Sequence, residues 1–246
     1  MKKVAIWIAV ILVGFTGCGI LGFTFISEPM PEGIKGPKAD SLATEVLRAT
    51  GYENWEKTGA VKFDFRGSHD FIWDVKRNYA QVSWKNKRVL LNLSDQQGVV
   101  YKDGEKQEDA QKALDMAWAL WCNDSFWFMA HHKLFDPGTE RQYVVLEDSS
   151  EALLVTYMEG GVTPGDSYLW LLDENRRPTG WKMWVKILPV GGMYFSWEKW
   201  KELETGVWVA TEHNTDIAGV PIGNPEAAAD LLDLTDGVDI FAELEQ

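Results

Sequence analysis

Cysteine is scarce in this chain of 246 residues, which contains only Cys18 and Cys122. A disulfide framework needs an even set of cysteines within the folded part of a protein. Cys18 lies in an apolar leader, so we expect Cys122 to stand alone. It follows Trp121 in an apolar segment, where a free cysteine usually behaves as a small hydrophobic residue. Neither a disulfide-linked scaffold nor a catalytic thiol is therefore expected.

Basic charge is also in short supply. The chain has 24 Lys and Arg residues against 37 Asp and Glu residues, which gives a formal net charge of −13. No cluster of basic residues follows Lys2 and Lys3 along the sequence. An acidic protein is repelled by the phosphates of nucleic acids and by anionic bilayer surfaces. We therefore expect no nucleic-acid partner.

The motifs of common enzyme classes are missing as well. The sequence has no Gly-x-Ser-x-Gly elbow and no His-Glu-x-x-His helix. Two glycine-containing stretches, "GEKQEDAQK" and "GGVTPGDS", do not end in the Gly-Lys-Ser/Thr of a phosphate-binding loop. These absences predict a protein that is not an enzyme and that needs no cofactor.

The stretch "CNDSFWFMAHHKLFDPG", residues 122–138, is the one place where chemically active side chains gather. His131 and His132 are adjacent, and neighbouring side chains on a helix point about 100° apart, so they cannot easily share a metal ion. We interpret them as the last turn of a helix, where cationic groups face unpaired carbonyls. The alternative is a hydrolase that uses His131 or His132 with Asp124 or Asp136.

The leader "MKKVAIWIAVILVGFTGCG" has the layout of an export signal, with two lysines before an apolar run. Phe15-Thr16-Gly17-Cys18 resembles a bacterial lipobox, which predicts a signal peptide at residues 1–17 and lipidation of Cys18. The alternative is an uncleaved anchor at residues 4–26, because a helix of that length reaches about 35 Å and spans a bilayer. Either way we expect a chain tethered to a membrane in the cell envelope, lipid-anchored and facing the periplasm.

Residues 27–38, "SEPMPEGIKGPK", are rich in proline and glycine and read as a linker. One folded domain is expected at residues 39–246, beginning with a helix in "ADSLATEVLRATGY". After this helix the apolar residues follow a period of two. About eleven strands are expected, at residues 60–67, 71–75, 80–85, 88–93, 98–104, 141–147, 151–159, 166–174, 179–187, 193–200 and 206–214. Their short links predict antiparallel neighbours.

A helical region near residues 105–135 is expected to cover the apolar face of this sheet. An apolar stripe with helical spacing runs from Ala110 to Trp121. Asn123-Asp124-Ser125 are poor residues for the middle of a helix, so a break and a second short helix are expected there. The fold class is thus mainly β with covering α-helices.

Three stretches are similar to an uncharacterised bacterial envelope family: "GYENWEKTGAVKFDFRGSHDFIWD", "NDSFWFMAHHKLFDPG" and "YLWLLDENRRPTGWKMWV". The resemblance covers most of residues 40–215. The family looks like the outer-membrane lipoprotein carrier and receptor fold of lipoprotein sorting. This resemblance implies an eleven-stranded antiparallel half-barrel that wraps around helices and encloses a hydrophobic cavity for acyl chains.

The chain has 13 Trp, 11 Phe and 7 Tyr residues, more aromatic surface than a core needs. We interpret the surplus as a surface for a lipid or lipoprotein acyl chain such as palmitate. Eight apolar residues are the candidates for the cavity, with plain core packing as the alternative for each. They are Phe63, Phe65, Trp73, Trp84, Trp118, Trp127, Trp181 and Met183.

A docking or assembly scaffold with a protein partner in the envelope is the remaining alternative. The tail "NPEAAADLLDLTDGVDIFAELEQ" sets leucines among acidic residues, and Asn224-Pro225 can begin a helix there. Such a helix would either bind a partner or pack back on the sheet.

Overall fold

The structure, a computed structural model, describes residues 27–188 and 190–245. The described residues divide into two compact units, each made of two segments: residues 27–49 with 131–197 (residue 189 excepted), and residues 50–130 with 198–245. None of the helices in the described ranges combines the length and the apolar character needed to cross a membrane. The predicted signal peptide, the anchor at residues 4–26 and Cys18 lie outside the described residues.

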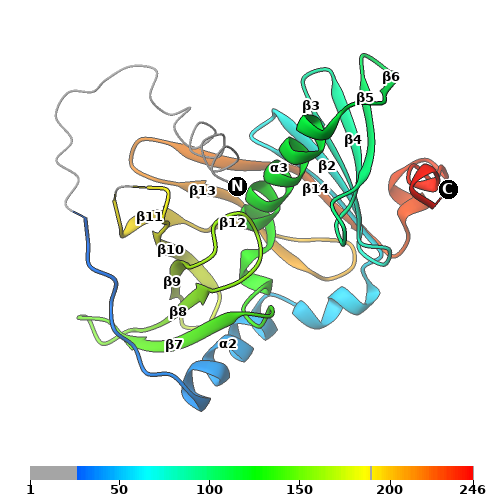
Figure 1. The fold of residues 1–246 in the computed structure, drawn as a ribbon. Helices are drawn as coiled ribbons and strands as arrows, with labels where there is room; N and C mark the ends of the chain where they lie inside the picture. The colour runs from blue at the N-terminus through cyan, green and yellow to red at the C-terminus, as the bar shows by residue number, and fades with distance from the viewer. Residues whose placement is uncertain (1–26, 189, 246) are drawn as a thin grey trace. The chain divides into compact units, whose positions relative to one another are not determined.

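The first unit contains a five-stranded antiparallel sheet, a meander in which strands adjacent in sequence are paired (Figure 1). Its strands are β7 (Thr139–Val145), β8 (Glu151–Tyr157), β9 (Asp166–Leu172), β10 (Pro178–Trp184) and β11 (Met193–Ser196). Helix α2 (Pro37–Ala49) packs on β7 and β8 through Leu42 and Val46, which are 3% and 0% exposed. The predicted first helix is confirmed.

Residues 27–36 precede α2 without regular structure, as the proline and glycine content predicts. They are nevertheless bonded to the same unit: Ile34 forms a β-bridge with Tyr143, and the Trp184 indole N–H donates to the carbonyl of Glu28 over 2.8 Å. Lys182 makes an ion pair of 2.6 Å with the Glu28 carboxylate. The expected linker therefore contacts the five-stranded sheet from Glu28 onward.

The second unit contains a nine-stranded antiparallel sheet in the order β12-β13-β14-β1-β2-β3-β4-β5-β6. Its strands are β1 (Ala60–Phe65), β2 (His69–Asp74), β3 (Tyr79–Trp84), β4 (Lys87–Asn92), β5 (Gly98–Lys102), β6 (Glu105–Gln107), β12 (Glu198–Glu202), β13 (Trp208–Asn214) and β14 (Gly219–Ala228). The short helix η1 (Tyr52–Lys57) precedes β1. Pairing of β1 with β14 joins the two segments of this unit.

Tight turns make the meander possible. Asp103 and Gly104 connect β5 to β6 with φ angles of 53° and 84°, the left-handed pair that a two-residue hairpin turn requires. Gly104 adopts this conformation without strain because it has no Cβ. This turn ends the expected strand at residues 98–104 two residues early, because β5 stops at Lys102.

The predicted fold class, mainly antiparallel β with covering helices, is confirmed, and the arrangement is consistent with a half-barrel. The number of strands differs: the described residues form fourteen strands in two sheets. The expected strand at residues 193–200 is two strands, β11 and β12, which belong to different sheets. In the sequence they are separated by Trp197, which is buried. Strands β6 and β14 were not expected.

Helix α3 (Gln111–Met129) lies against β3, β4 and β5, and the short helix η2 (Ala130–His132) follows it. The helix begins later than predicted because Glu105–Gln107 pair as β6. The predicted break at Asn123-Asp124-Ser125 is wrong. Ser125 Oγ donates to the Trp121 carbonyl over 2.6 Å, and Asp124 accepts from Asn123 Nδ2 over 2.8 Å. Asp124 also bonds to His69 on β2, so these polar side chains have partners while the helix continues through them.

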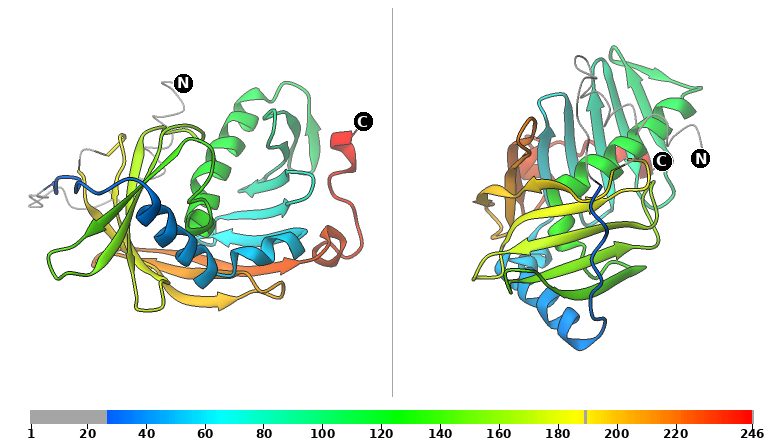
Figure 2. Two further views of the ribbon diagram at one scale, coloured as in Figure 1. Left: turned by 90° about the horizontal axis from the view of Figure 1, so that it is seen from below. Right: turned by 90° about the vertical axis from the view of Figure 1, so that its left-hand side faces the viewer.

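The chain after β13 also differs from expectation. Residues 224–228 belong to β14 rather than to a helix, because Ile222, Ala227 and Ala228 are buried and pair with β1. Residues 230–245, the C-terminal segment, contain η3 (Leu231–Leu234) and η4 (Ala242–Glu245). This segment and α3 lie on opposite sides of the nine-stranded sheet (Figure 2).

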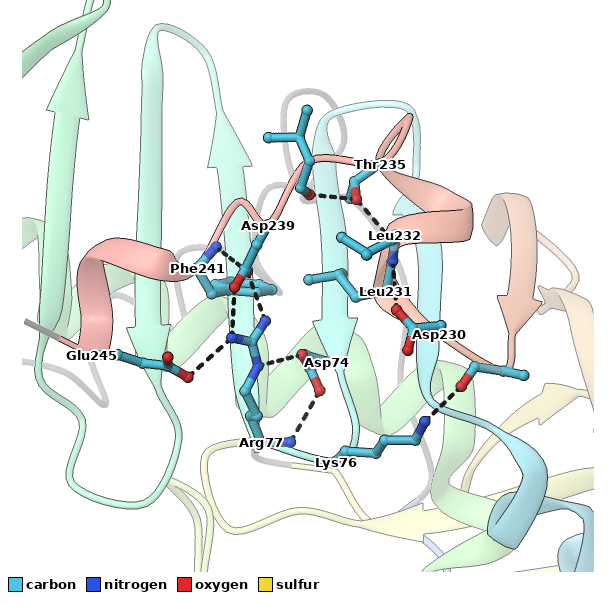
Figure 3. Close-up of polar contacts among 12 residues, drawn as sticks. Asp74, Lys76, Arg77, Asp230, Leu231, Leu232, Thr235, Asp239, Phe241 and Glu245 are labelled. Atoms are coloured by element: carbon cyan, nitrogen blue, oxygen red, sulfur yellow. Dashed lines mark hydrogen bonds and ion pairs between the residues drawn. The ribbon is translucent and has the colours of Figure 1, made fainter.

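The C-terminal segment is held by an apolar anchor and an ionic one. Phe241 is 0% exposed and packs with Leu90 and Leu231. Arg77 Nε donates to Asp74 over 2.7 Å, and its two terminal nitrogens reach Asp239 and Glu245 over 2.7 and 3.0 Å (Figure 3). One guanidinium thus ties the end of the chain to the sheet.

We predict that Arg77→Met lowers the free energy of unfolding by about 2–4 kcal/mol, because Asp74, only 6% exposed, loses its partner. Urea unfolding measures the change. The bond to Arg77 lowers the pKa of Asp239, so this stabilisation is present above the ordinary aspartate pKa of about 3.9 and is lost as the pH falls below it. The gap between variant and wild type should shrink accordingly in acid.

The control is Lys106→Met, which removes the exposed ion pair with Glu243 in the same segment. It should change stability far less. Equal losses in the two variants would contradict the assignment of Arg77 as the main ionic anchor.

Candidate functional site

A pocket of about 300 Å³ lies between α3 and one end of the nine-stranded sheet, entirely within the second unit; we call it the α3 pocket. Its lining joins apolar side chains with lysines. The lining residues are Trp84, Lys87, Val100, Lys102, Gln107, Asp109, Ala110, Lys112, Ala113 and Met116.

The sheet wall of the pocket follows from strand alternation. Val82, Val89 and Val100 lie opposite one another on β3, β4 and β5 and are at most 3% exposed. Two residues further along each strand, on the same face, the next row consists of Trp84, Lys87 and Lys102. The buried valine row thus gives way to an indole and two ammonium groups near the start of α3.

The helix wall is made of small and flexible side chains. Ala110, Ala113 and Met116 come from the N-cap and the first turns of α3. Ala110 cannot cap the helix with its side chain, and no side-chain cap bond is present. Alanines leave room between helix and sheet where larger residues would close it.

The charge of the pocket is opposite to that of the chain. The lining contains three lysines, Lys87, Lys102 and Lys112, and one carboxylate, Asp109, so its formal charge is +2. Lys87 Nζ also lies 5.8 Å from the centre of the Trp84 ring. The combination can hold a ligand that is apolar at one end and anionic at the other.

The eight residues expected to line a cavity have different surroundings. Trp84 lines the α3 pocket, and Trp118 on α3 is half-buried. Phe63 stacks between Phe71 and Phe128 with ring centroids 4.8 and 4.3 Å away, which is core packing.

Phe65 is buried beside His69, Trp73 contacts Trp55 and Trp121, and Trp127 contacts His213. Trp181 and Met183 belong to the other unit. That these eight contact a ligand stays a prediction.

Much of the aromatic surplus has a structural use. Trp170, Trp181 and Trp197 form a triangle of edge-to-face contacts in the first unit, with centroids 4.9–5.1 Å apart and exposures of at most 1%. Tyr168 extends it at 4.7 Å from Trp181, and burial raises the pKa of Tyr168. Such pairs stabilise a core beyond their buried area. For these residues the packing alternative explains the aromatic side chains, while an aromatic surface for a ligand stays a prediction.

The two adjacent histidines lie in η2, at the end of the helical region as predicted, and are 0% and 5% exposed. The His131 ring packs 5.2 Å from Trp197. The carboxylates named for a hydrolase bond elsewhere: Asp136 accepts from Lys133 over 2.6 Å, and Asp124 bonds to His69. The described ranges contain no group of three or more His, Cys, Asp or Glu residues that could hold a metal ion.

The contact between His69 and Asp124 joins β2 to the middle of α3. His69 Nδ1 lies 2.7 Å from Asp124 Oδ2, and the Asp124 side chain is 0% exposed while that of His69 is 18% exposed. Burial raises the pKa of Asp124, and the hydrogen bond to His69 opposes this shift. The pair fixes the position of α3 on the sheet. Sequence reasoning missed it because 55 residues separate the partners.

We predict a coupling free energy of about 1.5–3 kcal/mol between His69→Ala and Asp124→Ala in a double-mutant cycle, because either single change leaves a buried polar group without its partner. Urea unfolding of the two single variants and the double variant measures it. The more exposed pair of Lys133 and Asp136 is the control, with a coupling expected below about 1 kcal/mol. Additive effects for His69 and Asp124 would show that the contact does not hold the helix.

No protein-family model and no curated protein matches the chain. Among solved structures, it is similar to the crystal structure of a DUF1329 family protein from Desulfovibrio piger. The identity is 7%, the likeness covers 78% of this chain and 94% of that chain, and the TM-score is 0.40. A likeness at this level supports no inference about function, which has to be argued from the chain's own residues.

Proposed function

We propose that the protein is a non-catalytic binding protein, tethered to a membrane of the bacterial envelope and facing the periplasm, that holds an acyl chain of a lipid or lipoprotein. The observation that supports this best is the α3 pocket. It has an apolar wall of Trp84, Val100, Ala113 and Met116 and opens beside charged groups.

The size of the pocket fits part of an acyl chain. Its volume of about 300 Å³ is at the lower end of small-molecule sites. Burying ten methylenes contributes about 8 kcal/mol at ~0.8 kcal/mol each before the cost of association is subtracted.

The chemistry of the lining supports a binding role. The lining residues include no His, Cys, Ser or Thr, and Asp109 is their one carboxylate. Lysine and aspartate can also act as acids, bases or nucleophiles, but catalysis needs such groups within hydrogen-bond reach of each other, and Asp109 forms no ion pair with the three lysines of the lining. A protein partner in the envelope, the alternative that the acidic tail suggested, has less support because Leu231 and Phe241 of that tail are buried against their own sheet.

Filling the pocket tests the proposal. We predict that Ala113→Trp reduces lipid bound to the full-length protein by at least about threefold, because the indole occupies space between α3 and β5. The full chain is transferred from membranes into amphipol, and lipid per protein is measured by mass spectrometry after extraction. The control, Gln111→Trp, adds the same side chain at an exposed site on the same helix outside the pocket lining.

Unchanged lipid in Ala113→Trp, with thermal unfolding showing an intact fold, would contradict binding in the α3 pocket. Absence of any lipid above an amphipol blank in the wild type would contradict the binding function altogether.

The tether has its own test. We predict that Cys18→Ser abolishes incorporation of an azide-labelled palmitate into the chain in growing bacteria, because the acylated thiol is gone. Labelled protein is detected in gels after click coupling. A wild-type chain that stays in the membrane fraction without taking up label would instead support the uncleaved anchor at residues 4–26.

A further inference from the structure

Three lysines of an acidic protein meet in one small pocket. Lys87 begins β4, Lys102 ends β5 and Lys112 lies in the first turn of α3. The sequence does not show that these three lysines are neighbours, because strands and turns separate their positions. Folding creates the cluster.

None of the three has an acidic partner among the described residues: no Asp or Glu oxygen lies within 4.0 Å of their ammonium groups. Elsewhere seven other lysines form such ion pairs, including Lys106 and Lys182.

Lys87 and Lys102 are also direct cross-strand neighbours in the register of β4 and β5. Like charges at opposed positions destabilise an antiparallel pair. An anion placed between them would remove this repulsion.

The nearby carboxylates do not already serve as that anion. Asp109 lines the pocket beyond ion-pair distance of the lysines, and Glu105 is the register neighbour of Lys102 on β6 without an ion pair. Asp103, next in the chain, accepts two hydrogen bonds of 2.9 Å from Asn86. The positive side of the pocket stays available to a ligand.

We propose that the α3 pocket binds an anionic amphiphile, with a carboxylate or phosphate head group between Lys87, Lys102 and Lys112 and the chain against Trp84 and Met116. The site orients its ligand: Lys102 and Lys112 are exposed while Val100 is buried, so the head group stays at the water side. This inference rests on the proposed acyl-chain binding and names the ligand class that it takes.

The test compares two photo-reactive probes of equal length, a diazirine-bearing dodecanoic acid and the corresponding dodecanol. Each is titrated into the full-length protein in amphipol, cross-linked by light and located by peptide mass spectrometry. We expect the acid to bind the α3 pocket with an affinity at least about tenfold higher than that of the alcohol, as measured by labelling of pocket peptides, because each lysine contributes a modest charge interaction. Added salt should lower the affinity for the acid and leave that for the alcohol unchanged.

The variant is the triple change of the pocket lysines, and the control is a triple change of lysines of the same unit outside the pocket, which alters net charge equally. The two sets are Lys87→Gln with Lys102→Gln and Lys112→Gln, and Lys57→Gln with Lys62→Gln and Lys85→Gln. We expect the pocket variant to lower the affinity for the acid by about 10- to 100-fold and to leave the alcohol within about threefold. The control should change neither.

The outcomes separate this inference from the function that it rests on. Equal labelling by acid and alcohol, unaffected by the pocket variant, would overturn the head-group assignment and leave acyl-chain binding standing. Labelling by neither probe would overturn both. Competition by inorganic phosphate at concentrations similar to those of the acid would show a site for small anions and overturn the amphiphile. Loss of affinity for both probes would mean that the lysines shape the pocket rather than select charge.

Discussion

The position of α3 on the nine-stranded sheet is the constraint on which the candidate site depends. The C-terminal half of the helix is fixed by large groups, as Phe128 stacks on Phe63 at 4.3 Å and Asp124 bonds to His69 at 2.7 Å. The N-terminal half presents Ala110 and Ala113 to the sheet. Because the helix is rigid, close contact at one end and small side chains at the other leave a gap over β3–β5. The pocket is a consequence of this gradient in side-chain size.

The same sheet has a second apolar face, and the C-terminal segment covers it. An exposed apolar sheet face is a site of aggregation, so the segment protects this surface. Arg77 makes this cover specific, since one planar guanidinium orients carboxylates from three places in the sequence. The nine-stranded sheet therefore packs between two different elements. Helix α3 covers one face and leaves a pocket, and the acidic C-terminal segment covers the other face and is bound by Arg77.

Local sequence patterns predicted what is local in the structure. The period of two located eleven strand regions, and the stripe from Ala110 to Trp121 located most of α3. Errors arose where a distant partner overrides local preference. Asp124 and Ser125 would favour a helix break by themselves, yet bonds to His69 and to the Trp121 carbonyl keep the helix continuous. Pairing with β1 likewise turned residues 224–228 into a strand.

The grouping of Lys87, Lys102 and Lys112 in the α3 pocket could not be predicted from the sequence. The three lysines are distant in the chain, and only the strand register and the position of α3 bring them together. Their setting has a further physical meaning. The chain has a net charge of −13, whereas the pocket has a formal charge of +2 and attracts an anion over a few ångströms, within one Debye length. If an anionic amphiphile binds, this distribution of charge confines the attraction for its head group to the pocket.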